Sequence, residues 1–279
     1  GMVRRKNTLN TMLSCFFICG LAALMWVMFG YSLAFGTDHG GIIGGLNHLF
    51  FNGVGENINE AYAPTIPEAL FAGFQMMFAI ITPALICGAL AERMKFSTLF
   101  IFVAIWSVVV YYPLAHMVWG DGGFLRELGA VDFAGGNVVH ISSGISGLVA
   151  CILLGKRPGY GLMSYKPHNI PFVFLGAGLL WFGWFGFNAG SALGANELAV
   201  HAFLTTNTSA AAALLSWMLI EKIKYGKPTL MGAATGAVIG LVAITPGAGF
   251  VPIWASIIIG ALVSPLCFVF ITKIKSKFG

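Results

Sequence analysis

The sequence predicts an all-α polytopic membrane protein with about eight transmembrane helices. Of its 279 residues, 58% are hydrophobic and only 9% are charged, whereas soluble globular domains carry about 25% charged residues. Apolar windows long enough to span a bilayer recur along the whole chain. Basic residues gather between alternate windows, which is the distribution expected when each window crosses a membrane.

Eight windows have the length of a membrane span. A helix needs roughly 20 apolar residues to cross the hydrocarbon core, and it satisfies its own backbone hydrogen bonds there. A transmembrane β-barrel would instead contain short segments of alternating hydrophobicity, which this sequence lacks. The predicted spans are 11–35, 67–91, 97–119, 136–155, 170–190, 197–220, 229–247 and 252–272.

The loop charges predict the orientation. With eight spans both ends lie on one side, and that side receives 14 of the 15 Lys and Arg residues, leaving only Arg126 opposite. The positive-inside rule then puts both ends in the cytoplasm of a plasma or inner membrane. These anchors explain the net charge of +5, so no nucleic-acid partner is needed. They are Arg4, Arg5, Lys6, Arg93, Lys95, Lys156, Arg157, Lys166, Lys222, Lys224, Lys227, Lys273, Lys275 and Lys277.

The chain is predicted to form a single transmembrane domain over residues 1–279. It contains no short-period repeat, linker or low-complexity tract. Its five cysteines lie in hydrophobic windows without metal-ligand spacing, so we interpret them as packing residues. No metal and no cofactor is expected.

Three histidines lie within predicted spans, His116, His140 and, one turn into its span, His201; ionisable groups are costly there and are candidates for function. Asp132 suits a helix start, because its carboxylate can accept backbone N–H groups. His140 follows eight residues later, about 12 Å along a helix and close to the membrane midplane. Position alone leaves a pore histidine and a histidine bonded to a neighbouring helix equally open. His116 precedes Trp119 near an outer boundary, where a structural role is favoured.

Aromatic residues share helix faces in two places. Phe74 and Phe78 are four residues apart, and Trp184, Phe187 and Ser191 are spaced three and four apart. Aromatic faces can hold a cation, and a Ser hydroxyl can accept a hydrogen bond from an N–H donor. The alternative is that these rings face lipid or form an interfacial belt, which spacing alone favours.

Six stretches together resemble the ammonium transporter (Amt/Mep/Rh) family, on the Amt side. They occur in family order and span nearly the whole chain, so their combination is far more specific than any one of them. The stretches are "GALAERMKF", "YYPLAHMVWG", "VDFAGGNVVHISSGISGLV", "GKRPGYG", "KPHNIPFVFLGA" and "GWFGFNAGSA".

The resemblance implies a role for each candidate residue. An outer site recruits ammonium through aromatic faces and a hydroxyl, a phenyl gate closes the pore, and histidines line it. The implied substrate-binding residues are Phe78, Trp119, Ser191 and Trp184; the pore-lining residues are Phe74, Phe187 and His140; and Asp132 is a supporting acid near the outer mouth. Phe78 and Phe187 are the implied gate.

The resemblance also implies a mechanism and an assembly. Ammonium, or methylammonium in its place, would be recruited outside, and neutral ammonia would cross the apolar section with or without a separate proton. Family members are homotrimers with one pore per subunit. A regulator of the PII type is a family partner, but the cytoplasmic tail that takes part is absent from these residues, which argues against that partner for this chain.

The sequence departs from the family pattern in its extent. The family fold is an inverted repeat of five plus five helices within eleven spans, whereas eight spans are predicted here. The opening "GMVRRKN" resembles the loop after the first family span, and "ITKIKSKFG" precedes the span that carries the second pore histidine. We therefore expect a partial version of the fold, lacking the first and last two spans, that does not transport alone.

Two other functions compete with transport. An ammonium-sensing membrane domain would be favoured by a fused signalling domain, which this sequence does not contain. An enzyme using Asp132 and His140 is disfavoured, because about 12 Å along one helix is too far for a direct hydrogen bond. No nucleophile elbow, zinc motif or phosphate loop occurs, so we do not expect an enzyme.

Overall fold

Eight helices in the described part of the chain, residues 1–162 and 165–275, are long and apolar enough to cross a membrane. This confirms the predicted number of spans. The third and sixth run beyond their predicted ends, while the predicted cytoplasmic Lys277 lies outside the described residues. The spans are Arg5–Phe35, Glu68–Leu90, Phe96–Glu127, Gly136–Leu154, Ile170–Ala192, Glu197–Tyr225, Leu230–Gly247 and Ile253–Ile274.

The contacts of the computed structural model divide the chain into two units. The N-terminal unit is Lys6–Ser164, and the C-terminal unit is Gly1–Arg5 together with Tyr165–Gly279. Each unit contributes four of the eight spans, and each is described by itself. The single domain over residues 1–279 stays a prediction.

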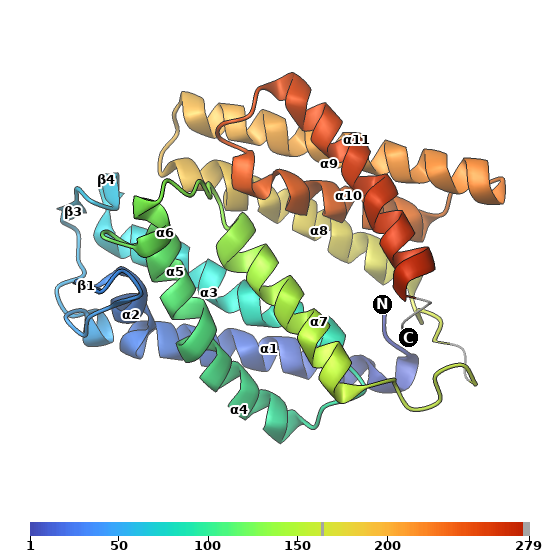
Figure 1. Ribbon diagram of the computed structural model, residues 1–279, viewed down its shortest axis with the longest axis horizontal. Coiled ribbons are helices and arrows are strands. Elements are labelled where there is room, and N and C mark those ends of the chain that lie inside the picture. The colour runs from blue at the N-terminus through green and yellow to red at the C-terminus, as the bar shows by residue number, and fades with distance from the viewer. Residues whose placement is uncertain (163–164, 276–279) are drawn as a thin grey trace. The chain divides into compact units, whose positions relative to one another are not determined.

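The N-terminal unit holds the first four spans, whose helices are labelled α1 to α7 in Figure 1. Two of these spans pass through an internal π-helical turn. Such turns insert one extra residue into a helix and are frequent at functional sites. A third π-helical turn, Gly136–Ile141, begins the fourth span. The elements are α1 (Thr8–Met25), η2 (Trp26–Gly30), α2 (Tyr31–Phe35), α3 (Glu68–Leu90), α4 (Phe96–Trp106), η4 (Ser107–Tyr111), α5 (Tyr112–Trp119), α6 (Phe124–Glu127), η5 (Gly136–Ile141) and α7 (Ser142–Leu154).

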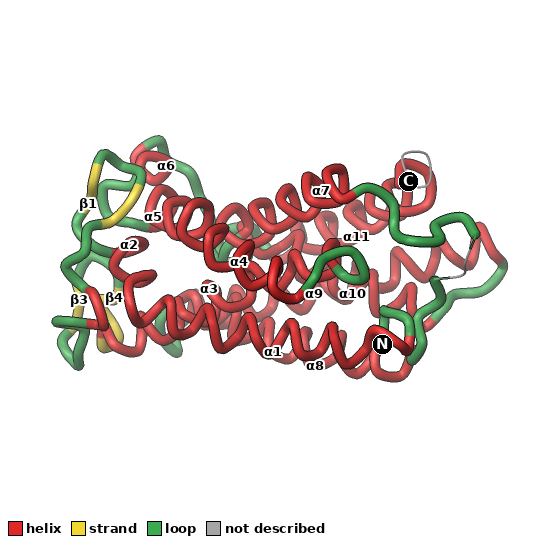
Figure 2. The backbone as a smooth tube through the Cα atoms, turned by 90° about the horizontal axis from the view of Figure 1, so that it is seen from below, coloured by secondary structure: helices red, strands yellow, loops and turns green. Residues whose placement is uncertain are grey.

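Two small hairpins lie in the loop between α2 and α3, which the all-α prediction did not include. Strand β1 (Asp38–His39) pairs with β2 (Ile43–Gly44), and β3 (Ile58–Asn59) pairs with β4 (Ala63–Pro67). Figure 2 shows these strands at the end of the unit where α2 ends and α6 lies. Strands this short carry little periodicity, so no sequence pattern predicted them.

Polar groups anchor the N-terminal unit, because lipid removes most of the hydrophobic drive between helices. The buried Trp26 donates its indole N–H to the Ala72 carbonyl at 3.0 Å, which ties η2 to α3. At the other end of α3, Arg93 donates to the Ala89 carbonyl and Arg157 to the carbonyls of Gly88 and Ala91. These guanidinium groups satisfy C-terminal carbonyls that a helix leaves unpaired.

The C-terminal unit is a bundle in which α9 packs against both α10 and α11 (Figure 1). Side-chain caps begin its helices: Asn169, Asn196 and Thr229 each accept the backbone N–H three residues later. The elements are α8 (Ile170–Asn188), η6 (Ala189–Ala192), α9 (Glu197–Tyr225), α10 (Leu230–Ile244), η7 (Thr245–Gly247), α11 (Ile253–Val269) and η8 (Phe270–Ile274).

Small residues let the helices of this bundle approach closely. A Cβ at Gly240 would lie 2.6 Å from the Ser209 carbonyl oxygen, and one at Gly260 would overlap that same oxygen. The Ser209 hydroxyl in turn donates to the Gly240 carbonyl at 2.9 Å. Close backbone contact and hydrogen bonds between helices replace hydrophobic drive as the source of stability in a membrane.

Candidate functional site

The carboxylate of Asp132 is enclosed by the start of the fourth span. Its two oxygens accept the backbone N–H groups of four successive residues, Gly135 to Val138, at 2.6–3.1 Å. Gly135 has φ 102°, a left-handed conformation that favours glycine and turns the chain around the carboxylate. Burial raises the pKa of the Asp132 carboxyl, and the four N–H groups oppose that rise. Asp132 thus accepts backbone N–H groups at the start of the fourth span, as expected, but it lies before the first helical residue, Gly136.

His140 lies in the π-helical turn that follows this carboxylate. The helix begins at Gly136 rather than at Asp132, so the helical rise to His140 is about 6 Å instead of the expected 12 Å. The π turn shows in the backbone, where the His140 N–H bonds the Gly135 carbonyl at 3.1 Å. The depth of His140 in a bilayer therefore depends partly on how far the non-helical residues 132–135 extend along the membrane normal.

Trp119 lies at the end of α5, and its indole N–H is already hydrogen-bonded within the protein. That N–H donates to the Asp132 carbonyl oxygen at 2.9 Å. The Trp119 ring meets the buried Phe78 ring edge to face, with centroids 5.7 Å apart, and Phe78 meets Phe74 at 5.0 Å. Phe74 and Phe78 thus lie on α3, Trp119 on α5 and His140 on η5, and Asp132 lies in the loop before η5. Element η5 contacts both α3 and α5.

The other three predicted residues lie together in the C-terminal unit. Trp184 is buried, and its ring lies tilted against that of Phe187, with centroids 5.1 Å apart and an interplanar angle of 33°. It donates its indole N–H to the Thr245 hydroxyl at 3.0 Å. Ser191 donates its hydroxyl hydrogen to the Phe187 carbonyl at 2.8 Å. A hydroxyl that already donates its hydrogen still has lone pairs, so it can only accept a hydrogen bond from a further partner.

Some partners of these residues had no signal in the sequence. The Thr245 hydroxyl orients Trp184, but the two residues are far apart in the chain. The Asp132 carbonyl orients Trp119, but this acceptor is a backbone group, which every residue has. His116 is also more deeply placed than its interfacial position predicted: it is fully buried and bonded to Asp38 and the Ala34 carbonyl. No spacing rule links residues 78 positions apart.

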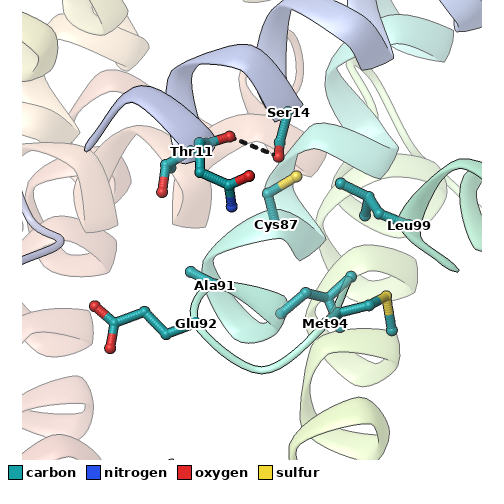
Figure 3. Close-up of a pocket in the computed structure, with 9 residues that line it drawn as sticks. Thr11, Ser14, Cys87, Ala91, Glu92, Met94 and Leu99 are labelled. Carbon is teal, nitrogen blue, oxygen red and sulfur yellow. Dashed lines mark hydrogen bonds between the residues drawn. The ribbon is translucent and has the colours of Figure 1, made fainter. Parts of the chain in front are cut away.

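A small pocket lies away from these residues, in the N-terminal unit. It is lined by Asn10, Thr11, Ser14, Cys87, Leu90, Ala91, Glu92, Met94 and Leu99, from α1, the end of α3 and the start of α4 (Figure 3). None of the predicted site residues lines it. Within residues 1–162 and 165–275, no three His, Cys, Asp or Glu side chains gather as metal ligands would.

The eight long apolar helices define a multi-pass membrane protein. A family model described as "Ammonium Transporter Family" matches residues 1–279. The chain belongs to this family.

Individual relatives agree. The chain is 52% identical to the ammonium transporter of Bacillus subtilis over 279 residues, covering all of this chain and 68% of that protein. It is 48% identical to the ammonium transporter Amt1 of Archaeoglobus fulgidus, covering 99% and 68%. The crystal structure of Saccharomyces cerevisiae Mep2 matches with a TM-score of 0.92 at 38% identity, covering 100% of this chain and 62% of that one. The chain therefore spans about two thirds of the length of these relatives.

Proposed function

We propose that the protein moves ammonium across a cell membrane, recruiting the ion at an outer aromatic and hydroxyl site and passing ammonia through an apolar pore. The observation that carries this proposal is the fixed indole of Trp119. Because its N–H is used by the Asp132 carbonyl, the ring has its π face, rather than a donor, to offer. A π face attracts a cation.

The hydroxyl of Ser191 supports the same ligand. Its hydrogen is donated to the Phe187 carbonyl, so it offers only lone pairs, which suit a ligand that carries four N–H donors. Trp119 and Phe78 belong to one unit and Ser191 to the other. The family resemblance assigns them to one recruitment site, with Trp184 beside it, and that assignment is part of the proposal.

The chemistry of ammonium explains why these groups would suffice. A bare ion pays a large desolvation cost in an apolar pore, and aromatic faces with a hydroxyl acceptor offset part of it at the mouth. Potassium has a similar size but no N–H donors and no proton to lose. Selectivity therefore follows from hydrogen bonding and deprotonation, after which neutral ammonia passes the Phe78 and Phe187 gate and His140.

Assembly and orientation are proposed with the function. Both ends of the chain lie in the cytoplasm, because one side of the eight spans carries 14 of the 15 basic residues. The protein works as a homotrimer, on the family resemblance. Binding of a PII-type regulator has no support among these residues.

A sensor is the second candidate. A structure titled "Sensor Amt Protein" matches the chain with a TM-score of 0.88 at 30% identity, covering 99% of this chain and 70% of that one. A sensor would bind methylammonium without net uptake. The higher identity to proteins named ammonium transporters favours transport.

The test is saturable uptake of labelled methylammonium by transporter-deficient cells that express the intact gene. Ammonium should compete and potassium should not. Trp119→Leu should raise KM about 30-fold if the cation–π contact is worth about 2 kcal/mol, whereas the exposed Trp254 provides a matched control in Trp254→Leu. Equal competition by potassium, or an unchanged KM in Trp119→Leu, would refute the proposed site.

Ser191 has its own matched pair. Ser191→Ala should raise KM about tenfold, because it removes an acceptor for a charged donor. Ser216 also donates to a backbone carbonyl, that of Ala261, in the same unit. Ser216→Ala should leave KM unchanged, and equal effects of the two substitutions would count against a role for the Ser191 hydroxyl in recruitment.

A further inference from the structure

His116 lies fully buried between two hydrogen-bond acceptors. Its Nδ1 is 2.9 Å from the carbonyl oxygen of Ala34, near the end of α2, and its Nε2 is 2.9 Å from Oδ1 of Asp38 in β1. A backbone carbonyl can only accept, and an ionised carboxylate can only accept. Both ring nitrogens therefore face groups that need a hydrogen.

A neutral imidazole cannot satisfy both partners, because it carries one N–H. The contacts are complete only if the pair holds one more proton than a neutral histidine and an ionised aspartate. Asp38 Oδ1 also accepts the Gly41 N–H at 2.7 Å. The hydrogen bond with His116 is the main cause that holds the pKa of the Asp38 carboxyl below its usual value; burial opposes it, and the Gly41 N–H adds to it. Because Oδ1 already accepts the Gly41 N–H, the geometry assigns the hydrogen between Oδ1 and Nε2 to the histidine.

The Asp38–His116 pair joins β1 to the end of α5 that carries Trp119. Trp119 follows His116 by three residues, so it lies one helical turn further on. The His116 carbonyl accepts the Gly120 N–H at 2.8 Å, which closes the helix after Trp119. The β1–β2 turn is tied to the same region, because the Gly41 carbonyl accepts the Phe124 N–H at 2.8 Å.

The pair is asymmetric in its access to solvent. The Asp38 side chain is 33% exposed, while that of His116 is 0% exposed. Water can therefore reach the proton only from the carboxylate side, which the proposed orientation puts outside the cell. Other titratable or charged groups around it are His39 in β1, Tyr62 beside the second hairpin, and the weak pair of Asp121 and Arg126 after α5.

We propose that His116 is a positioning residue for the outer cation site, and that with Asp38 it holds one proton that fixes the outer end of α5 and the Trp119 indole. Loss of that proton to the outer solution leaves Nδ1 or Nε2 facing an acceptor without a hydrogen, and the α2–α5 contact loosens. The link to cation recruitment rests on the proposed function, whereas the proton itself does not.

The direct test is ¹⁵N NMR of the histidine-labelled protein in lipid nanodiscs at pH 7.5. The chain has six histidines, and His116→Gln assigns the His116 signals. We expect both ring nitrogens of His116 to be protonated, although a free imidazole is mostly neutral at this pH. In Asp38→Asn, Nε2 should lose its proton, while the control Asp121→Asn should keep it. A neutral His116 in the wild-type protein, with Asp38 ionised, overturns the proposal.

A second measurement separates positioning from a purely structural role. Fluorine-labelled tryptophan should give a Trp119 signal that shifts between pH 6 and 9 in the wild-type protein and in Asp121→Asn, but not in Asp38→Asn. Methylammonium KM should rise about three- to tenfold in Asp38→Asn relative to Asp121→Asn at pH 7.5, the size expected for one charged hydrogen bond acting through a helix turn. An unchanged Trp119 signal and KM in Asp38→Asn overturn the positioning role, whereas absence of methylammonium uptake by the wild-type protein refutes only the proposed function.

Discussion

Replacing Asp132 with alanine should destabilise the protein more than any other single change in the proposed outer site. The substitution removes the acceptor of four backbone N–H groups, those of Gly135 to Val138. Three of the four residues are buried, so water cannot replace the carboxylate oxygens at those positions.

The magnitude follows from these hydrogen bonds. Each buried N–H left without a partner costs about 1–3 kcal/mol, and removing the buried carboxylate returns part of that cost, because burial disfavours its charge. We expect a net loss of about 3–5 kcal/mol of unfolding free energy, against about 0.5–2 kcal/mol for an ordinary N-cap. Asp132→Asn keeps one oxygen and should lose roughly half as much.

The assay is reversible unfolding in mixed micelles, followed by circular dichroism. Asp121→Ala is the matched control, because the Asp121 side chain is 68% exposed and only 3.7 Å from Arg126. We expect that control to change stability by less than about 0.5 kcal/mol. If Asp132→Ala costs less than about 1 kcal/mol, the interpretation of the carboxylate as the support of the fourth span is wrong.

Three further outcomes follow from the same geometry. Gly260→Val should destabilise the protein by about 1–3 kcal/mol, because the new side chain would overlap the Ser209 carbonyl. Gly178→Ala, with open space around its Cβ position, should change stability by less than about 1 kcal/mol. Similar losses in both variants, measured by unfolding in micelles, would contradict the close packing of these helices. Stability should fall in acid as the pH drops through the folded-state pKa of Asp38, because a lowered pKa gives stability that is present above the unfolded value and lost on protonation; Asp38→Asn should flatten that part of the pH profile, and an unchanged profile would count against it. Trp119→Phe keeps an aromatic face but loses the N–H to the Asp132 carbonyl, so methylammonium KM should rise less than in the leucine variant, and an equal rise would point to the N–H rather than the face.

Contacts between residues close together in the sequence were predictable, whereas other features of the site were not. The four-residue spacing of Phe74 and Phe78 predicted their ring contact, and the order of Asp132 before the fourth span predicted its role at a helix start. The π-helical turn at His140 was not predictable, because a one-residue insertion leaves the apolar pattern of so hydrophobic a stretch unchanged. The small hairpins between α2 and α3 were missed for a similar reason, since strands of two to five residues show little or no period.

The membrane class, the eight spans and the family were all readable from the amino-acid sequence. Lipid imposes these features locally, because each span must be apolar over its own length and satisfy its own backbone hydrogen bonds. Which polar groups meet across spans became visible in the packed helices alone. The hydrogen bond between Asp38 and His116 and the carbonyl that orients Trp119 join residues that the chain separates. Such contacts depend on how helices pack rather than on any pattern within one helix.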